Sequence, residues 1–168
     1  FPRDVKRYDA DGFFVSWSEV EAKTLEEVAI KNGTTLFSLL MTAFKILLSR
    51  YTGIEDIIVG TPVRGRHLEG LNSLIGYFVN SVAVRSQISS QKSFTHNLKK
   101  VSENLISVFD HSNVPFDEIV KELKVARNPF HTPVYQAFMM FQDATARNVK
   151  FLDYDFSEYD YIKNAKEE

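Results

Sequence analysis

The sequence predicts an α/β domain in which helices pack on a mixed β-sheet. Segments with apolar residues at helical spacing alternate along the chain with short β-prone runs. Their order is strand, two helices, strand, strand, helix, helix, strand, strand, an order that favours layers of helix and sheet. The 168 residues are enough for one domain with a sizeable core.

The first elements are a strand and a helix. Residues 1–12 are expected to form a polar lead-in, and residues 13–17, FFVSW, a short strand. Ser18 followed by Glu21 makes a capping box, which predicts a helix that begins there and ends at Gly33. The residues expected to face inward from this helix are Leu25, Val28 and Ala29.

The strongest helical pattern is TLFSLLMTAFKILLSRY, residues 35–51, which ends at Thr52-Gly53. Its broad apolar face consists of Leu36, Leu39, Leu40, Ala43, Phe44, Leu47 and Leu48. Its polar positions follow one narrow stripe formed by Ser38, Thr42, Lys45 and Ser49. A helix with so much apolar surface is expected to be covered on most sides.

Two strands follow this helix. Residues 56–63, DIIVGTPV, predict a buried strand that Gly60 and Pro62 interrupt. After the loop RGRHLEG, the run LIGYFVNSVAVR at 74–85 reads as a strand from Tyr77 onward, with side chains on alternating faces.

The last third of the chain predicts two helices and two strands. Residues 93–110 form a helix with an apolar stripe, and Pro115 opens a short helix that runs to Leu123. The runs at 134–142 and 149–156 are expected to be strands. The stripe of the longer helix consists of Phe94, Leu98, Val101, Leu105 and Val108.

Composition excludes several kinds of partner and chemistry. A net charge of −2 favours neither nucleic acid nor an anionic membrane as a partner. The chain has no cysteine, which excludes disulfides, thiolate metal sites and a cysteine nucleophile, and predicts a reducing cytoplasm. No apolar run approaches the roughly 18 residues of a membrane helix, and the opening FPRDVKRYDADG lacks the apolar core expected of a signal peptide.

Motifs for known catalytic chemistry are missing from the sequence. No two of the four histidines have metal-ligand spacing, and the glycines form neither GxGxxG nor a P-loop. GxSxG is absent as well. The residues taken alone therefore predict an α/β domain with no visible catalytic set and no metal site. The histidines are His67, His96, His111 and His131.

Two polar residues remain open to two interpretations. Asn80 lies on an otherwise apolar strand face, so its amide either bonds neighbouring backbone or points into a polar site; left unpaired in the interior it would cost about 1–3 kcal/mol. Arg66 either lies in a solvated loop or reaches under a site to pin a carboxylate. The residues that share the face of Asn80 are Phe78, Val82 and Val84.

Four segments resemble the signatures of one protein family. IGYFVNSVAVR at 75–85 resembles I-G-x-F-V-N-T followed by Arg, with Ser81 in place of Thr, and HSNVPFDEIV at 111–120 resembles H-Q-D-x-P-F-E. ARNPFHTPVYQAFMMFQ at 126–142 resembles a third signature, and TLFSLLMTAFKILLSRYTGIEDIIVGTPVRGR at 35–66 closely resembles a fourth segment. In this order and at this spacing, residues 13–142 resemble the condensation domain of non-ribosomal peptide synthetases.

The resemblance implies a chloramphenicol acetyltransferase-like sandwich, with residues 13–156 as its C-terminal lobe only and 157–168 as an acidic, aromatic tail, truncated or frayed. The family's H-H-x-x-x-D-G does not occur in these residues. The chain alone is therefore expected to be inactive, with no catalytic residue of its own. In the intact enzyme it would serve amide-bond formation between aminoacyl or peptidyl thioesters.

The implied partners are the N-terminal lobe, an adenylation domain in the parent chain, and donor and acceptor carrier proteins with their phosphopantetheine arms. The chain itself is expected to bind no cofactor. Two alternatives remain: a non-catalytic half-domain that docks a partner, and part of a stand-alone acyltransferase that uses carrier or CoA thioesters. The F-V-N of 78–80 favours condensation over epimerisation.

The resemblance also assigns roles to residues. It places Asn80 at the wall of a substrate tunnel and makes Arg66 a candidate for bracing the active-site Asp of the other lobe. Supporting or tunnel positions are further expected at Gly76, Tyr77 and Arg85. Residues expected to shape the lobe rather than touch substrate are His111, Pro115, Phe116, Arg127 and Pro129.

Overall fold

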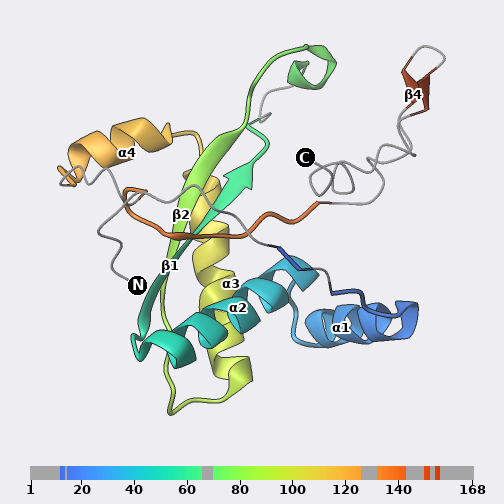
Figure 1. Cartoon of the computed structure of the whole chain (residues 1–168), viewed down its shortest axis with the longest axis vertical. Coiled ribbons are helices and arrows are strands. Elements are labelled where there is room, and N and C mark those ends of the chain that lie inside the picture. The colour runs from blue at the N-terminus through green and yellow to red at the C-terminus, as the bar shows by residue number, and fades with distance from the viewer. Residues whose placement is uncertain are drawn as a thin grey trace.

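The computed structural model describes residues 12–13, 15–65, 70–125, 132–142, 150–151 and 154–155 (Figure 1). Its helices are α1 (Glu19–Lys31), α2 (Leu36–Thr52), α3 (Phe94–Asp110) and α4 (Phe116–Glu122), with a 3-10 turn at Leu71–Ser73. Its strands are β1 (Asp56–Val63), β2 (Asn80–Gln87), β3 (Ala137–Phe138), β4 (Lys150–Phe151) and β5 (Tyr154–Asp155).

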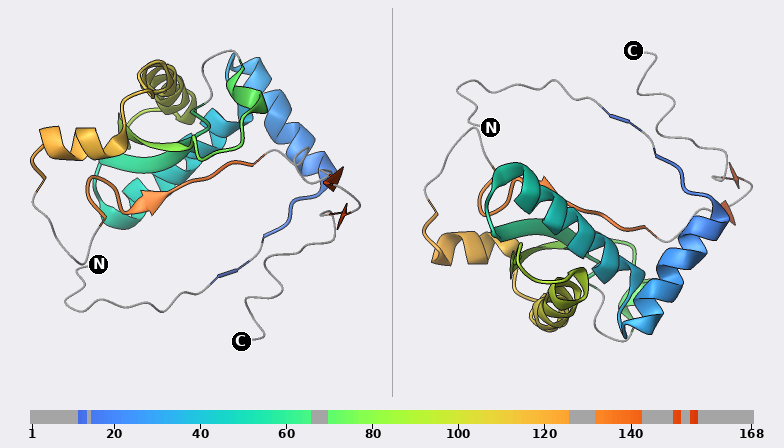
Figure 2. Two further views of the ribbon diagram at one scale, coloured as in Figure 1. Left: turned by 90° about the horizontal axis from the view of Figure 1, so that it is seen from above. Right: turned by 90° about the horizontal axis from the view of Figure 1, so that it is seen from below.

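The central sheet is mixed, as the sequence predicts. Its strand order is β2-β1-β3, with β2 antiparallel and β3 parallel to β1. All eight residues of β1 pair with β2, from Asp56 opposite Gln87 to Val63 opposite Asn80. Figure 2 shows α3 beside β2 and β3 beyond β1, so β1 is the middle strand of the sheet.

The main core lies between one face of the β1–β2 pair and the helices α2 and α3. Val59 and Val84 oppose each other in the sheet and are fully buried, together with Met41 of α2 and Val101 of α3. Burying each such side chain contributes about 1.5–3 kcal/mol. A smaller cluster of Ala29, Leu39 and Leu98 attaches α1 to this core.

The predicted helix ends are confirmed by their hydrogen bonds. The Ser18 hydroxyl accepts from the Glu21 amide, and the Glu21 carboxylate accepts from the Ser18 amide, so the capping box is complete. Ser93 caps α3 in a similar way, and Gly53 ends α2 in the left-handed conformation at φ 72°. These signals lie within a few residues of each helix end, so they involve no tertiary contact.

The helix α2, which the sequence predicts to be covered on most sides, buries its polar stripe together with Leu39 and Met41. The polar stripe is among its most deeply buried parts: Thr42 and Lys45 have no exposed surface, whereas Leu47 is 49% exposed. The stripe faces inward because its polar atoms find partners, such as the bond from the Thr42 hydroxyl to the Ser38 carbonyl at 2.7 Å. The exposed fraction of Val28 on α1 is 38%, so its predicted burial is wrong.

Several predicted strands are shorter than the sequence suggests. The described residues among 13–17 form no strand, since no neighbouring strand pairs with them there, and Phe13 is 87% exposed. β2 begins at Asn80 rather than Tyr77, and the run at 134–142 contributes only Ala137–Phe138 to the sheet. The run at 149–156 contains two short antiparallel strands, β4 and β5, instead of one strand.

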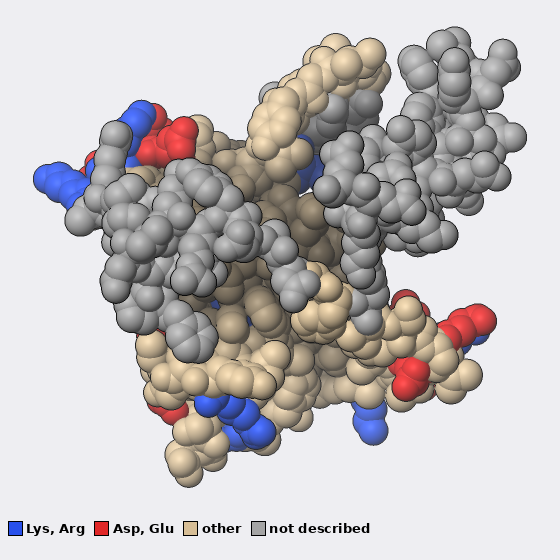
Figure 3. Space-filling view, viewed as in Figure 1, with Lys and Arg blue, Asp and Glu red and all other residues tan. Residues whose placement is uncertain are grey.

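Charged side chains lie at the margins of the face shown in Figure 3, where both signs gather over α4 and over α1. This arrangement agrees with a nearly balanced net charge of −2. Among the residues that the structure describes, no helix combines the length and apolar character needed to cross a membrane.

Candidate functional site

The side chain of Asn80, at the first position of β2, joins the strand to the loop between α3 and α4. Its amide nitrogen donates to the carbonyls of Ser112, at 2.9 Å, and Val114, at 2.8 Å. Its amide oxygen accepts from the backbone N–H groups of Ser81, at 2.9 Å, and Phe116, at 3.2 Å. We call this set of four bonds the Asn80 clamp.

The clamp uses both N–H groups of the amide and both lone pairs of its oxygen. The sequence left two interpretations of Asn80 open, and the structure shows the one in which the amide bonds backbone. The partners, however, lie more than 30 residues further along the chain, apart from Ser81. Asn80 therefore holds the motif at 75–85 against the motif at 111–120.

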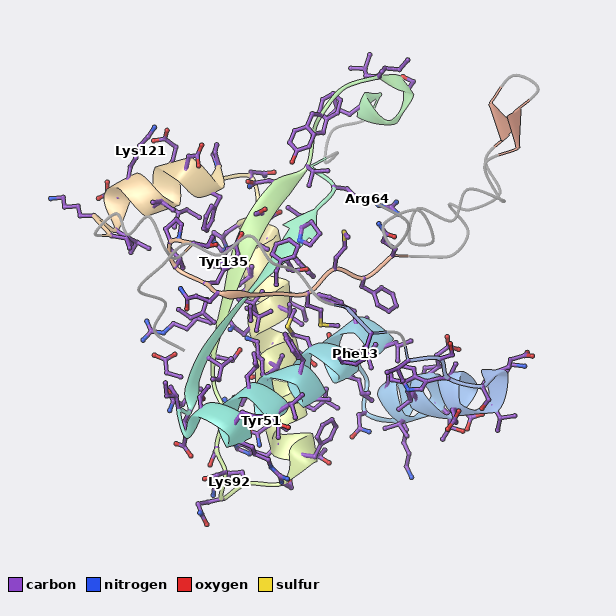
Figure 4. All side chains as sticks on the ribbon, in the orientation of Figure 1. Phe13, Tyr51, Arg64, Lys92, Lys121 and Tyr135 are labelled. Atoms are coloured by element: carbon purple, nitrogen blue, oxygen red, sulfur yellow. The ribbon has the colours of Figure 1, made fainter. Side chains whose placement is uncertain are left out.

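Phe116, whose backbone amide belongs to the clamp, also makes an aromatic contact. Phe116 is the first residue of α4, directly after Pro115 at its N-cap, and its ring lies 5.2 Å from the ring of Tyr135. Tyr135 is only 9% exposed and also contacts Phe138, at a ring distance of 5.9 Å. Aromatic pairs at such distances contribute about 0.5–1.5 kcal/mol beyond their buried area. Figure 4 labels Tyr135 where the segment 132–142 crosses the strands.

Gly60 of β1 makes room for the Tyr135 ring. A Cβ atom at Gly60 would lie 2.5 Å from Cε2 of Tyr135 and 2.8 Å from Cδ2 of Phe138. Any larger residue at this position would displace the ring. Sequence reasoning missed Tyr135, but an isolated glycine inside a strand is a recognised sign of close approach by another part of the chain.

The backbone before Tyr135 is strained. The Tyr135 amide donates to the Pro133 carbonyl at 2.9 Å, and Val134 between them has φ +71°. This is a γ-turn with a positive φ at a β-branched residue, which costs on the order of 1–3 kcal/mol. The turn places the Tyr135 ring against Gly60 and Phe116.

Arg85 forms an ion pair across the β1–β2 pair. Its Nε lies 2.9 Å and its terminal nitrogen 2.7 Å from the two carboxylate oxygens of Asp56. Hydrogen bonds from Arg85 hold the pKa of Asp56 below its usual value, and the carboxylate raises the pKa of Arg85. The Arg85 side chain is 71% exposed. In this structure it supports the strand pairing at the solvent surface.

The segment before β2 is largely exposed. Tyr77 is 88% exposed, and Gly76 is exposed next to the ring of Phe78. Gly65, at φ +63°, packs so closely that a Cβ there would lie 1.8 Å from the Phe78 carbonyl oxygen. The chain after β1 therefore approaches the chain before β2 so closely that only glycine fits there.

Of the remaining predicted site residues, the structure describes His111 but not Arg66, Arg127 or Pro129. His111 is exposed at the end of α3, where its Nδ1 lies 2.8 Å from the Ser107 carbonyl oxygen. Arg66, Arg127 and Pro129 lie outside the described residues, as do His67 and His131. Within the part of the chain that the structure describes, no three acidic or histidine side chains are grouped to hold a metal ion.

The chain is similar to peptide synthetases in sequence and in structure. The Condensation domain family model matches residues 2–167. Tyrocidine synthase 3 of Brevibacillus parabrevis is 34% identical over 161 residues, 95% of this chain and 2% of that synthase. A four-domain nonribosomal peptide synthetase, solved with AMP and glycine, aligns at 26% identity and a TM-score of 0.72 over 74% of this chain and 10% of that one.

One further structure supports the fold alone. The first condensation domain of the calcium-dependent antibiotic synthetase, solved with a substrate analogue, aligns at 24% identity with a TM-score of 0.59, over 63% of this chain and 24% of that one. The chain thus spans a small part of each relative. Because the family model matches nearly all of it, the chain belongs to the condensation domain family of nonribosomal peptide synthetases and has their chloramphenicol acetyltransferase-like α/β fold.

Proposed function

We propose that the chain is the C-terminal lobe of a condensation domain, and that it serves amide-bond formation between aminoacyl or peptidyl groups carried as thioesters. The amine of the acceptor would attack the thioester carbonyl of the donor, so that a C–N bond forms, the C–S bond breaks, and the carrier thiol leaves. Both groups would arrive on phosphopantetheine arms of carrier proteins. The parent chain would also hold an adenylation domain and work in the cytoplasm.

The observation that carries this proposal is the family match over residues 2–167. The geometry supports it, because segments that resemble separate family signatures meet in space. The Asn80 clamp joins 75–85 to 111–116, the ring contact of Phe116 with Tyr135 joins 111–120 to 126–142, and Gly60 adds β1. Segments far apart in the chain thus contact one another in a single cluster.

The contribution of this chain is one of positioning. Its 168 residues lack H-H-x-x-x-D-G, so we assign the reacting histidine to the other lobe. The Asn80 amide is occupied by backbone, so its role is to hold the wall of the passage rather than to bond the substrate. Holding reactants in a fixed geometry is itself a large part of catalysis in transfer reactions. Arg66 remains a candidate for bracing the aspartate of the other lobe.

The test uses the longer polypeptide that carries this chain, with donor and acceptor carriers loaded and amide product measured by mass spectrometry. Product should form, and Asn80→Ala should reduce its rate at least tenfold. The matched control is Asn113→Ala, an exposed amide in the clamped loop, which should keep the parental rate. A polypeptide with both carriers loaded that forms no amide would overturn the proposal and favour a docking role.

A further inference from the structure

Lys45 of α2 is a fully buried amine. Its exposed fraction is 0%, and its Nζ donates to the Val84 carbonyl at 2.7 Å and to the Ser86 hydroxyl at 2.8 Å. Asn104 of α3 donates to the same hydroxyl at 3.2 Å and to the Arg85 carbonyl. Two helices and a strand therefore meet at this one nitrogen and the hydroxyl beside it.

Both hydrogen-bond partners of Lys45 are uncharged, and none of the ion pairs found among the described residues includes it. The nearby charges come from the sheet: Asp56 of β1 attracts the ammonium, but Arg85 of β2 binds that carboxylate. Arg50, the other charged residue of α2, is exposed. α1 and α3 present only exposed charged or ionisable side chains, which are Glu19, Glu21, Lys23, Glu26, Glu27, Lys31, His96, Lys99, Lys100, Glu103 and Asp110. An ammonium here loses its hydration without gaining a bonded counter-ion.

We propose that Lys45 is a proton-binding site built into the interface between α2 and β2, and that proton uptake there loosens the packing of α2 on the sheet. Proton release leaves an amine that still donates to Val84 and Ser86. The proposal concerns the fold of this chain and is independent of its proposed function. Burial lowers the pKa of Lys45 to about 7, although the negative charge of Asp56 acts to raise it. The site would therefore exchange its proton near neutral pH.

The sign of the effect follows from linkage between protons and folding. Unfolded lysine has a pKa of 10.5, and the folded value is about 7, so the unfolded chain binds more protons between these values. The folding equilibrium constant should therefore fall about tenfold for each pH unit from 10.5 down to 7, and the Lys45 contribution should level off below pH 7.

The first experiment measures urea unfolding of the 168-residue chain by circular dichroism at roughly pH 7.5, 8.5 and 9.5, where few ordinary side chains change charge. The ratio of the folding constants of wild type and Lys45→Met should change about tenfold per pH unit. The control Lys99→Met, at an exposed position of α3, should follow wild type. Parallel pH dependence in wild type and Lys45→Met would overturn the proposal.

A second measurement needs no variant that could fail to fold. In wild-type chain labelled with ¹³C at lysine Cε, one resonance should titrate with a midpoint near pH 7, far below the other lysines. If every lysine resonance of the folded chain titrated above about pH 9.5, near the ordinary lysine value, the site would not exist.

Discussion

Replacing Asn80 tests whether the clamp holds the site together. Asn80→Ala removes four hydrogen bonds and leaves two carbonyls and two N–H groups without their partner. If each bond contributes about 0.5–1.5 kcal/mol and no water replaced the amide, the free energy of unfolding would fall by about 2–6 kcal/mol. Because Asn80 is half-buried, water reaches part of the site, and we expect a destabilisation of about 2–3 kcal/mol.

Asn80→Asp tests the bonds that the Asn80 amide accepts separately from those that it donates. The carboxylate keeps an acceptor for the Ser81 and Phe116 amides but places its second oxygen against the Ser112 and Val114 carbonyls. The variant should be destabilised at pH 7 and should regain part of its stability as pH falls, because a protonated carboxyl can donate one bond. Asn80→Ala should show no such recovery.

The assay is urea unfolding followed by circular dichroism, together with hydrogen exchange of the Phe116 amide, which bonds the Asn80 oxygen. In Asn80→Ala we expect the free energy of unfolding to fall by about 2–3 kcal/mol. We also expect the Phe116 amide to exchange its hydrogen faster. Asn113→Ala should stay within about 0.5 kcal/mol of wild type, as exposed substitutions do. Equal stability of Asn80→Ala and Asn113→Ala would refute the reasoning.

The remaining predictions concern close packing and one ion pair. Gly60→Ala should cost about 1–3 kcal/mol by unfolding, and less in a Tyr135→Ala background, since the clash is with that ring; equal costs in both backgrounds would contradict this. Gly65→Ala should cost clearly more than Gly53→Ala, because both have positive φ but only Gly65 meets a carbonyl oxygen. The pKa of Asp56 is lowered by its arginine partner, so the pair should stabilise the fold above pH 3.8 and lose its effect as pH falls below that; Asp56→Asn should lack this dependence.

The sequence by itself determined the family, the α/β class, the helices and the strand β1. Capping residues and helical periodicity act over a few residues, so Ser18, Ser93 and Gly53 mark boundaries that the structure confirms. The mixed sheet follows from the order of the elements. Motif resemblance identified the family that the comparisons then showed.

Only the tertiary structure decided how long each strand is and where the polar residues point. A strand needs a neighbour, so the β-prone run at 134–142 pairs over just two residues. The stripe that holds Lys45 faces inward because Val84 and Ser86, some 40 residues away, supply its partners. Asn80 likewise bonds a loop more than 30 residues further along the chain. Local pattern cannot specify such contacts, because hydrogen-bond partners distant in sequence become neighbours only when the chain has folded.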